Sequence, residues 1–138
     1  MVTLARVGVF GAGAVGGTIG GALALAGRDV TLIGQWREHI DAVRKNGLRM
    51  VETTGTRVAH PQILHHEELG TLTQPFDVVL LCVKSYDTEW AVKAVAPHVE
   101  LAEIPGSDHH VTLDNPAEFV KMVLAFYNQD HYNRMYWL

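Results

Sequence analysis

Apolar and polar residues follow one another along the chain in blocks that predict strands and helices in turn. Apolar runs at 5–10, 29–33 and 76–83 predict strands, and the six consecutive apolar residues Val78 to Val83 are typical of a central parallel strand covered on both faces. Helical spacing is predicted at 14–26, 38–45, 88–96 and 118–127. Shorter β-prone runs at 48–52 and 56–60 flank Thr53–Gly55 and predict a hairpin, with a further short strand at 62–66. This alternation predicts an α/β fold.

A glycine-rich turn joins the first predicted strand to the first predicted helix. It reads GAGAVG from Gly11 to Gly16, which is the pattern G-x-G-x-x-G. The helix then runs to Gly27, a residue type that commonly follows a helix C-terminus, and a second strand comes next. A strand, turn, helix and strand within about 30 residues are the context in which this pattern binds a dinucleotide. The predicted fold is therefore a Rossmann-type parallel sheet with helices on both faces.

Each glycine of the turn has its own predicted role. Gly11 allows the tight turn, Gly13 lets a diphosphate approach the backbone because it has no Cβ, and Gly16 lets the helix lie near the strand. The amides of the first helical turn then face the phosphates, whose negative charge the helix dipole favours. A Gly/Ala-rich helix without a ligand is the alternative. The predicted cofactor-binding residues of the turn are Gly11, Ala12, Gly13, Ala14, Val15 and Gly16.

The residues after the second predicted strand indicate which dinucleotide is bound. An Asp or Glu there would hydrogen-bond the ribose 2′-hydroxyl of NAD, but the chain reads Gly34, Gln35, Trp36 and Arg37. The missing acid and the nearby cation favour the 2′-phosphate of NADP over NAD. We expect Arg37 to contact that phosphate and Gln35 to add a hydrogen bond. The alternative is that Arg37 is only a solvated residue of a first helical turn.

Two further features are candidates for chemistry. Lys84 directly follows the third apolar run, so it is expected at the carboxyl end of a strand, where open α/β sheets bind ligands. Its ammonium group can bind a phosphate or the carbonyl or carboxylate of a small acid, or else it points to water. His65 and His66 do not predict a metal site, because adjacent strand residues point to opposite sides and no Cys or third His has ligand spacing.

Composition and charge limit the partners and the cellular compartment that we expect. The 138 residues carry a formal charge of −4 and one cysteine, Cys82. The charge gives no reason to expect nucleic acid or an anionic membrane as a partner. A single cysteine excludes an internal disulfide and favours the reducing cytoplasm. We see no signal-peptide pattern and no apolar stretch long enough to span a bilayer.

Several motifs together resemble the ketopantoate reductase (2-dehydropantoate 2-reductase) family. They are GAGAVGG, VTLIG, the W-x-x-H-x-x-A-x-x-x-x-G-L run from Trp36 to Leu48, and FDVVLLCVKSYDT from Phe76 to Thr88. The resemblance covers about residues 1–99, the NADP-binding domain of that family. It implies NADPH-dependent reduction of a 2-keto acid in pantothenate biosynthesis, with Lys84 near nicotinamide and substrate. Many members carry an arginine where this chain has Gln35, so the phosphate contact is expected to shift to Arg37.

Residues 100–138 depart from this resemblance. They are predicted to form an atypical tail with one helix and no separate substrate domain, as truncation, a frameshift or a fusion would produce. The family's helical second domain, which supplies a catalytic lysine and a substrate-binding acid, has no counterpart there. The stretch from Ile104 to Tyr127 resembles the end of an α/β-hydrolase, with His109 at the place of the triad histidine. The chain has no G-x-S-x-G nucleophile, however, so hydrolysis is not predicted.

Three functions follow from these observations. The first is a reductase whose turnover is impaired or absent in the isolated chain, since a missing general acid typically costs 10²–10⁴-fold. The second is a non-catalytic dinucleotide-binding module. The third is an interaction role through the tail helix and the aromatic residues Tyr132, Tyr136 and Trp137, which could also form a homodimer contact.

Overall fold

The computed structural model describes residues 5–99 together with Ala117 and Lys121, both of which are helical. The rest of the predicted helix 118–127 lies outside the described residues, as do His109 and the three aromatic residues of the tail. The chain divides into two compact units, Met1–Glu100 and Leu101–Leu138, and the strands and helices named below belong to the first. The description of 100–138 as a tail without a substrate domain stays a prediction.

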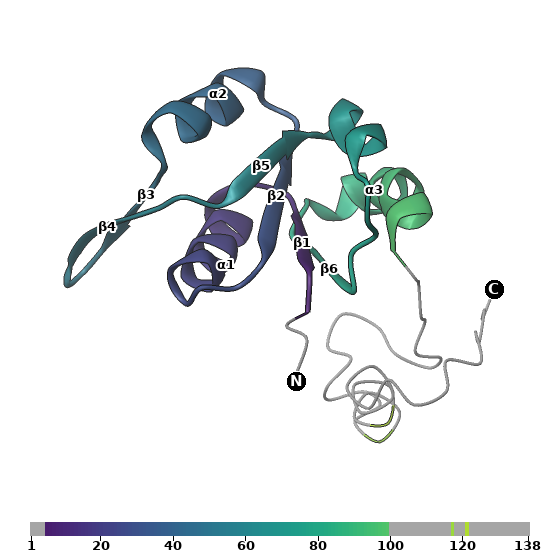
Figure 1. The fold of residues 1–138 in the computed structure, drawn as a ribbon, viewed down its shortest axis with the longest axis horizontal. Helices are drawn as coiled ribbons and strands as arrows, with labels where there is room; N and C mark the ends of the chain where they lie inside the picture. Colours follow the sequence, from purple (N-terminus) through teal and green to yellow (C-terminus); the bar gives the residue numbers. More distant parts are fainter. Residues whose placement is uncertain (1–4, 100–116, 118–120, 122–138) are drawn as a thin grey trace. The chain divides into compact units, whose positions relative to one another are not determined.

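Four parallel strands form the central sheet in the order β5–β2–β1–β6 (Figure 1). Val7 at the start of β1 is in register with Val30 on one side and Val78 on the other. This is the strand order of half a Rossmann sheet, so the predicted fold class is confirmed. The strands are β1 (Val7–Phe10), β2 (Val30–Gly34), β5 (Gln62–His65) and β6 (Val78–Leu81).

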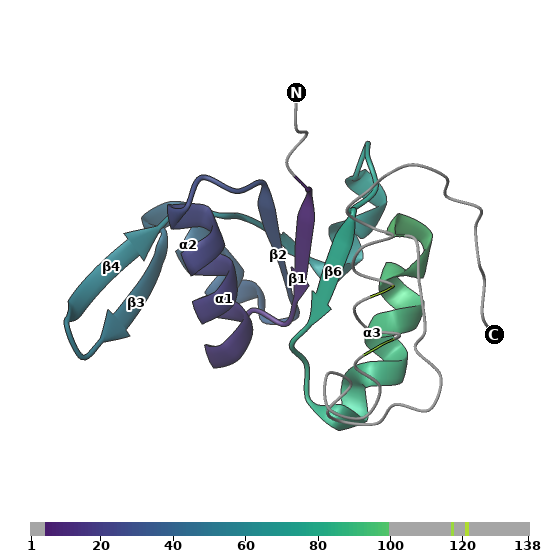
Figure 2. The same ribbon diagram turned by 90° about the horizontal axis from the view of Figure 1, so that it is seen from below.

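Helices cover both faces of the sheet (Figure 2). The helices α1 and α2 and a β3–β4 hairpin lie on one side, and α3 lies on the other. The predicted hairpin is present, but its turn consists of Thr53 and Thr54 alone, because Gly55 pairs with Glu52 and belongs to the second strand. The bounds are α1 (Ala14–Leu25), α2 (Arg37–Asn46), α3 (Thr88–Val95), β3 (Leu48–Glu52) and β4 (Gly55–Ala59), with 3₁₀ helices η1 (His66–Thr71), η2 (Ser85–Asp87) and η3 (Ala96–His98).

Alternation along β1 and β2 fills one hydrophobic core on each face. Val9 and Leu32 are fully buried on the side of α1 and α2, while Phe10 and Ile33 are fully buried on the side of α3. Because successive side chains of a strand point to opposite faces, uninterrupted apolar strands require a layer on each side. None of the helices in the described part of the chain is long and apolar enough to cross a membrane.

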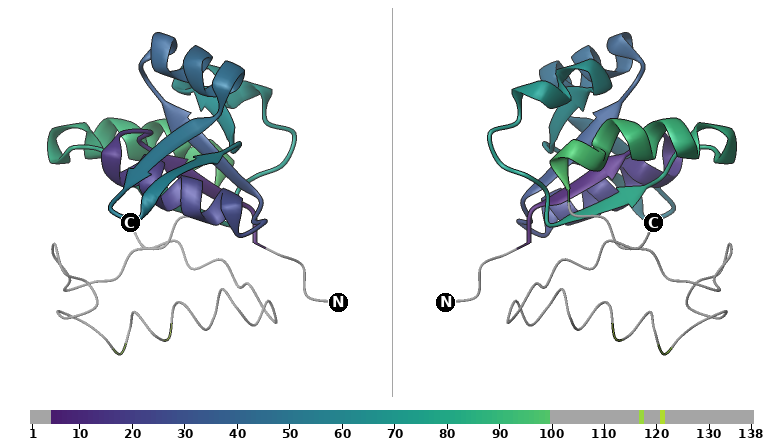
Figure 3. Two further views of the ribbon diagram at one scale, coloured as in Figure 1. Left: turned by 90° about the vertical axis from the view of Figure 1, so that its left-hand side faces the viewer. Right: turned by 90° about the vertical axis from the view of Figure 1, so that its right-hand side faces the viewer.

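The glycines within α1 permit close packing. A Cβ at Gly20 would overlap the side chain of Leu32 on β2, and one at Gly21 would overlap Met50 on β3. The hairpin lies beside α1 for this reason (Figure 3). These glycines each forgo up to about 1 kcal/mol of helix propensity relative to alanine, so tertiary packing decides the residue type here.

Helix α1 ends close to Gly27, where the sequence predicts its C-terminus. Gly27 has a φ of 71°, which glycine adopts without strain. Its amide donates to Ala24 and the amide of Arg28 donates to Leu23, at 3.0 Å each, so the last turn closes as a Schellman motif. Gly47 ends α2 with a positive φ of 80° but an extended ψ of 171°, and its amide donates to Val43 at 2.8 Å.

One prediction about the sheet is met only in part. The apolar run 76–83 predicted a central strand covered on both faces, and Leu80 and Val79 do pack against the two cores on opposite faces. However, β6 lies at the edge of the described sheet and spans only Val78–Leu81. Val78 and Leu81 are 37% and 40% exposed. Beyond β6, only an isolated parallel bridge joins Phe76 to Val99 in the described residues. An apolar run indicates that a strand can be buried. How far it is buried depends on the strands and helices that pack beside it.

Candidate functional site

The turn between β1 and α1 lies tightly against the end of β6. Gly11 has a φ of 110°, and a Cβ there would come within 2.5 Å of the carbonyl oxygen of Cys82. The amide of Gly11 donates to Ile33 of β2 at 2.8 Å, while the amide of Cys82 donates to Phe10 at 2.7 Å. The turn is therefore held at the carboxyl ends of three neighbouring strands, where open α/β sheets bind ligands.

Gly13 and Gly16 differ in what surrounds them. A Cβ at Gly13 would meet nothing within 4 Å, whereas one at Gly16 would overlap the carbonyl oxygen of Gly11. Gly16 thus serves the close packing of helix on strand, as predicted. Nothing within the described part of the chain requires the missing side chain at Gly13, so the open space above its backbone can admit a ligand.

The N-terminus of α1 is free to bind an anion. No side chain of the described residues caps the helix, and no acidic residue lies in its first turn. The first helical hydrogen bond runs from the amide of Gly17 to Gly13 at 2.7 Å, so the amides of Ala14, Val15 and Gly16 precede the helical ladder. Gly13, Ala14 and Val15 are exposed. Unpaired amides and the positive end of the helix dipole favour a phosphate at this place.

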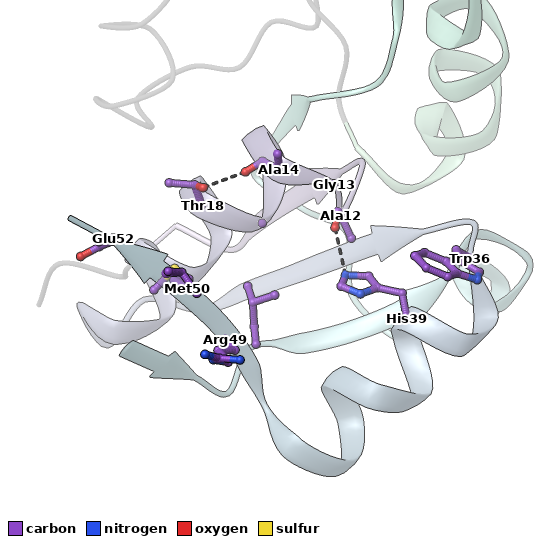
Figure 4. Close-up of a pocket in the computed structure, with 12 residues that line it drawn as sticks. Ala12, Gly13, Ala14, Thr18, Trp36, His39, Arg49, Met50 and Glu52 are labelled. Atoms are coloured by element: carbon purple, nitrogen blue, oxygen red, sulfur yellow. Dashed lines mark hydrogen bonds between the residues drawn. The ribbon is translucent and has the colours of Figure 1, made fainter. Parts of the chain in front are cut away.

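A pocket of about 470 Å³ opens beside the turn (Figure 4). This volume is in the range of small-molecule sites. Residues of α1, the start of α2 and β3 form its walls. Three of the predicted site residues, Ala12, Gly13 and Ala14, line it together with Gly17, Thr18, Trp36, His39, Leu48, Arg49, Met50, Val51 and Glu52.

His39 joins α2 to the glycine-rich turn. Its Nε2 lies 3.1 Å from the carbonyl oxygen of Ala12 (Figure 4). The ring stacks on Trp36, with centroids 5.9 Å apart and planes 21° apart, and the indole is 67% exposed. An exposed aromatic face beside an anion-binding turn can accept a planar ring such as a nucleobase.

Gln35 and Arg37, the predicted contacts of the 2′-phosphate, follow β2 but are not among the residues that line the pocket. Gln35 and Arg37 are both exposed, and the guanidinium group of Arg37 forms an ion pair with Glu67. The contact of Arg37 with a cofactor phosphate stays a prediction. The acid that the sequence lacks directly after β2 is supplied by η1, from a residue 30 positions further along the chain.

Lys84 follows the end of β6 and is exposed. Gly11 lies against the neighbouring Cys82 and Val83, so Lys84 is placed next to the glycine-rich turn in space. Burial raises the pKa of the Cys82 thiol, which therefore stays protonated at neutral pH and is a poor nucleophile. Lys84 is a cation available on this side of the turn for an anionic or carbonyl group.

The two histidines after β5 lie closer together than the sequence suggested. Their ring centroids are 4.3 Å apart, because His66 begins η1 instead of continuing the strand, so the expectation that they diverge is wrong. With Glu67 they form a three-residue cluster of metal-ligating types. Nδ1 of His65, however, accepts the amide of Glu67 and Nε2 donates to Gln35, which leaves that ring no free lone pair. The absence of a metal site stays a prediction.

Sequence reasoning missed His39 and Glu67 as members of the site. His39 stands within the W-x-x-H run, which gave no reason to aim its ring at Ala12 across 27 positions. Glu67 looked like part of an acidic surface pair with Glu68. The contact of His39 with Ala12 and that of Glu67 with Arg37 depend on which strands lie next to each other in the sheet. The local sequence pattern does not specify the strand order.

The strand order, the glycine-rich turn and the uncapped helix together define a Rossmann-type α/β domain. The family model described as ketopantoate reductase PanE/ApbA matches residues 7–104. The chain belongs to this family.

Curated relatives agree with this assignment. The chain is 42% identical over 91 residues to the 2-dehydropantoate 2-reductase of Halobacterium salinarum, an alignment covering 65% of this chain and 29% of that protein. It is 36% identical over 92 residues to the enzyme of the same name from Pyrococcus horikoshii, covering 64% and 28%. The chain thus spans under a third of the length of these relatives.

Solved structures show the same fold. A structure of the putative 2-dehydropantoate 2-reductase from Enterococcus faecalis matches with a TM-score of 0.63 and 33% identity, covering 78% of this chain and 36% of that one. A ternary structure of D-mandelate dehydrogenase with NADH and anilino(oxo)acetate matches with a TM-score of 0.60 and 26% identity, covering 65% and 28%.

Proposed function

We propose that the chain binds NADPH at the glycine-rich turn and serves the reduction of a 2-keto acid of the ketopantoate type. The observation that carries this proposal is the open backbone at Gly13 beside the uncapped first turn of α1. When bound, NADPH supplies the hydride that reduces a keto carbon. Membership of the ketopantoate reductase family supports the substrate class.

Six of the predicted residues have direct roles in this proposal. The amides of Ala14 and Val15 hold the diphosphate, and Gly13 allows its approach. Arg37 contacts the 2′-phosphate after release from Glu67, and Gln35 hydrogen-bonds nearby. Lys84 orients the carbonyl or carboxylate of the keto acid. We place the protein in the cytoplasm, in keeping with its single cysteine.

The preference for NADPH over NADH rests on Arg37. The structural relative D-mandelate dehydrogenase was solved with NADH, so the fold does not decide between the two nucleotides. A guanidinium group at the carboxyl end of β2 favours a phosphate, with which it forms charge-assisted hydrogen bonds. Titration of the chain with NADPH and NADH, followed by nucleotide fluorescence, tests this preference. Equal affinities would contradict the role of Arg37.

A non-catalytic dinucleotide-binding module is the second candidate. Lys84 is the one residue that this proposal assigns to the keto acid, and the alignment covers only 29% of a curated reductase. Tight NADPH binding without oxidation of the nucleotide in the presence of ketopantoate would favour the module. Turnover that depends on Lys84 would favour the reductase.

Lys84→Ala is expected to lower kcat/KM for ketopantoate by about 100-fold, because loss of a positioning contact costs roughly that much. NADPH affinity should change far less, since the diphosphate is held by α1. Lys93→Ala is the matched control, because Lys93 is an exposed lysine of α3 paired with Glu89. Absorbance of the reduced nicotinamide follows the reaction. Equal rates in the two variants would contradict a role for Lys84 in positioning the substrate.

A further inference from the structure

The loop after β2 is held in place by the corner between β5 and η1. Strands β2 and β5 are parallel neighbours, with Gly34 in register with His65, so the loops that follow them meet at one rim. His65 is buried, with 5% of its surface exposed, and its Nε2 lies 3.0 Å from the carbonyl oxygen of Gln35. A buried imidazole thus fixes the backbone of the residue that precedes Trp36 and Arg37.

Nδ1, the second ring nitrogen of His65, holds the backbone of Glu67. The amide of Glu67 donates to Nδ1 of His65 at 3.3 Å. Since Nδ1 accepts, Nε2 carries the proton and donates to Gln35, which specifies the tautomer. His65 therefore joins the backbone of Gln35 to that of Glu67. The carboxylate of Glu67 then reaches the guanidinium group of Arg37.

The adjacent acid, Glu68, has a different task. Its carboxylate accepts the amide of His65 at 2.7 Å and a hydrogen bond from Arg44 at 2.6 Å. These contacts hold the pKa of Glu68 below its ordinary value. Arg44 also donates to the carbonyl oxygen of Ile63 at 3.1 Å. Glu68 is thus held at the start of η1, whereas the carboxylate of Glu67 faces Arg37 in the loop after β2.

We propose that Glu67 is a specificity-determining residue that limits the preference for NADPH over NADH. Its carboxylate competes with a 2′-phosphate for Arg37 and repels that phosphate, while it can accept a hydrogen bond from a 2′-hydroxyl. The side chains of Arg37 and Glu67 are 61% and 60% exposed, so the pair is open to solvent and can be displaced by a ligand. This inference rests on the proposed binding of a nicotinamide dinucleotide at the turn.

The test compares Glu67→Gln with Glu89→Gln, each of which removes one negative charge from an exposed ion pair. Kd values for NADPH and NADH are measured by nucleotide fluorescence for both variants and the wild-type chain. Glu67→Gln should raise NADPH affinity about fivefold, the scale of an exposed charge pair, and should not raise NADH affinity. Glu89→Gln should leave both affinities unchanged. Melting temperatures confirm that the variants fold.

The outcomes separate this inference from the function on which it rests. If the wild-type chain binds both nucleotides and Glu67→Gln leaves their affinity ratio within about twofold of the wild-type ratio, the role of Glu67 is refuted and the nucleotide site stands. A lower NADPH affinity in Glu67→Gln would also refute it, because Glu67 would then orient Arg37 toward the phosphate. If the folded wild-type chain binds neither nucleotide, both proposals are refuted.

Discussion

Gly13→Val is expected to weaken NADPH binding strongly while leaving the fold intact. A Cβ at this position meets no atom within 4 Å, and the backbone there is extended, with a φ of −79°, so the folded chain accepts a side chain. The same side chain would occupy the space in which a diphosphate reaches the amides of α1. Loss of two hydrogen bonds to a charged group, at about 1.5 kcal/mol each, corresponds to a roughly 100-fold weaker Kd.

The matched control for this prediction is Gly70→Val. Gly70 lies in η1 and is exposed, and a Cβ added there would likewise meet no atom within 4 Å, but this glycine is not part of the turn. Fluorescence titration with NADPH and a thermal melt are measured for both variants. Undiminished NADPH binding by Gly13→Val would show that the ligand does not lie over the turn.

Gly16→Ala, unlike Gly13→Val, is expected to destabilise the fold itself. The added methyl group would overlap the carbonyl oxygen of Gly11 and lie 3.1 Å from Cβ of Cys82. Because the overlap involves backbone, the turn or the helix must move, and overpacking of this kind costs about 3 kcal/mol. In a domain of this size the melting temperature should fall by more than about 10 °C.

The neighbouring Gly17→Ala is the control for Gly16→Ala. A Cβ at Gly17 would lie 3.8 Å from Ala12 and 3.9 Å from Leu48, which is ordinary contact. Alanine in a helix interior is favoured over glycine by about 1 kcal/mol, so this variant should melt at a higher temperature than the wild-type chain. Two adjacent glycines of one helix should therefore respond with opposite signs. A similar change in both would contradict the packing described for Gly16.

Local features of the sequence predicted much of this unit. The turn, α1 and β2 were predicted almost to the residue because glycines, caps and periodicity act within a few positions. The closed ends at Gly27 and Gly47 and the tight turn at Gly11 follow from backbone conformations that glycine adopts readily. These conformations depend only on residues that are close together in the sequence.

Contacts between distant segments could not be predicted in the same way. The bond from His39 to Ala12 and the pair of Arg37 with Glu67 depend on strand order and register, which bring together residues 27 and 30 positions apart. The exposed edge of β6 depends on what packs beside it, not on its own apolar residues. The residues that follow β2 in the sequence therefore gave Arg37 but not its partner Glu67.

The most direct test of the nucleotide site is amide NMR of the isotopically labelled chain during titration with NADPH. The amide signals of Gly13, Ala14 and Val15 should show the largest shifts, and they should cease to move once the site is saturated. A well-dispersed spectrum in which these signals stay fixed in excess NADPH, or in which the shifts gather on other elements, would contradict a diphosphate held by the N-terminus of α1.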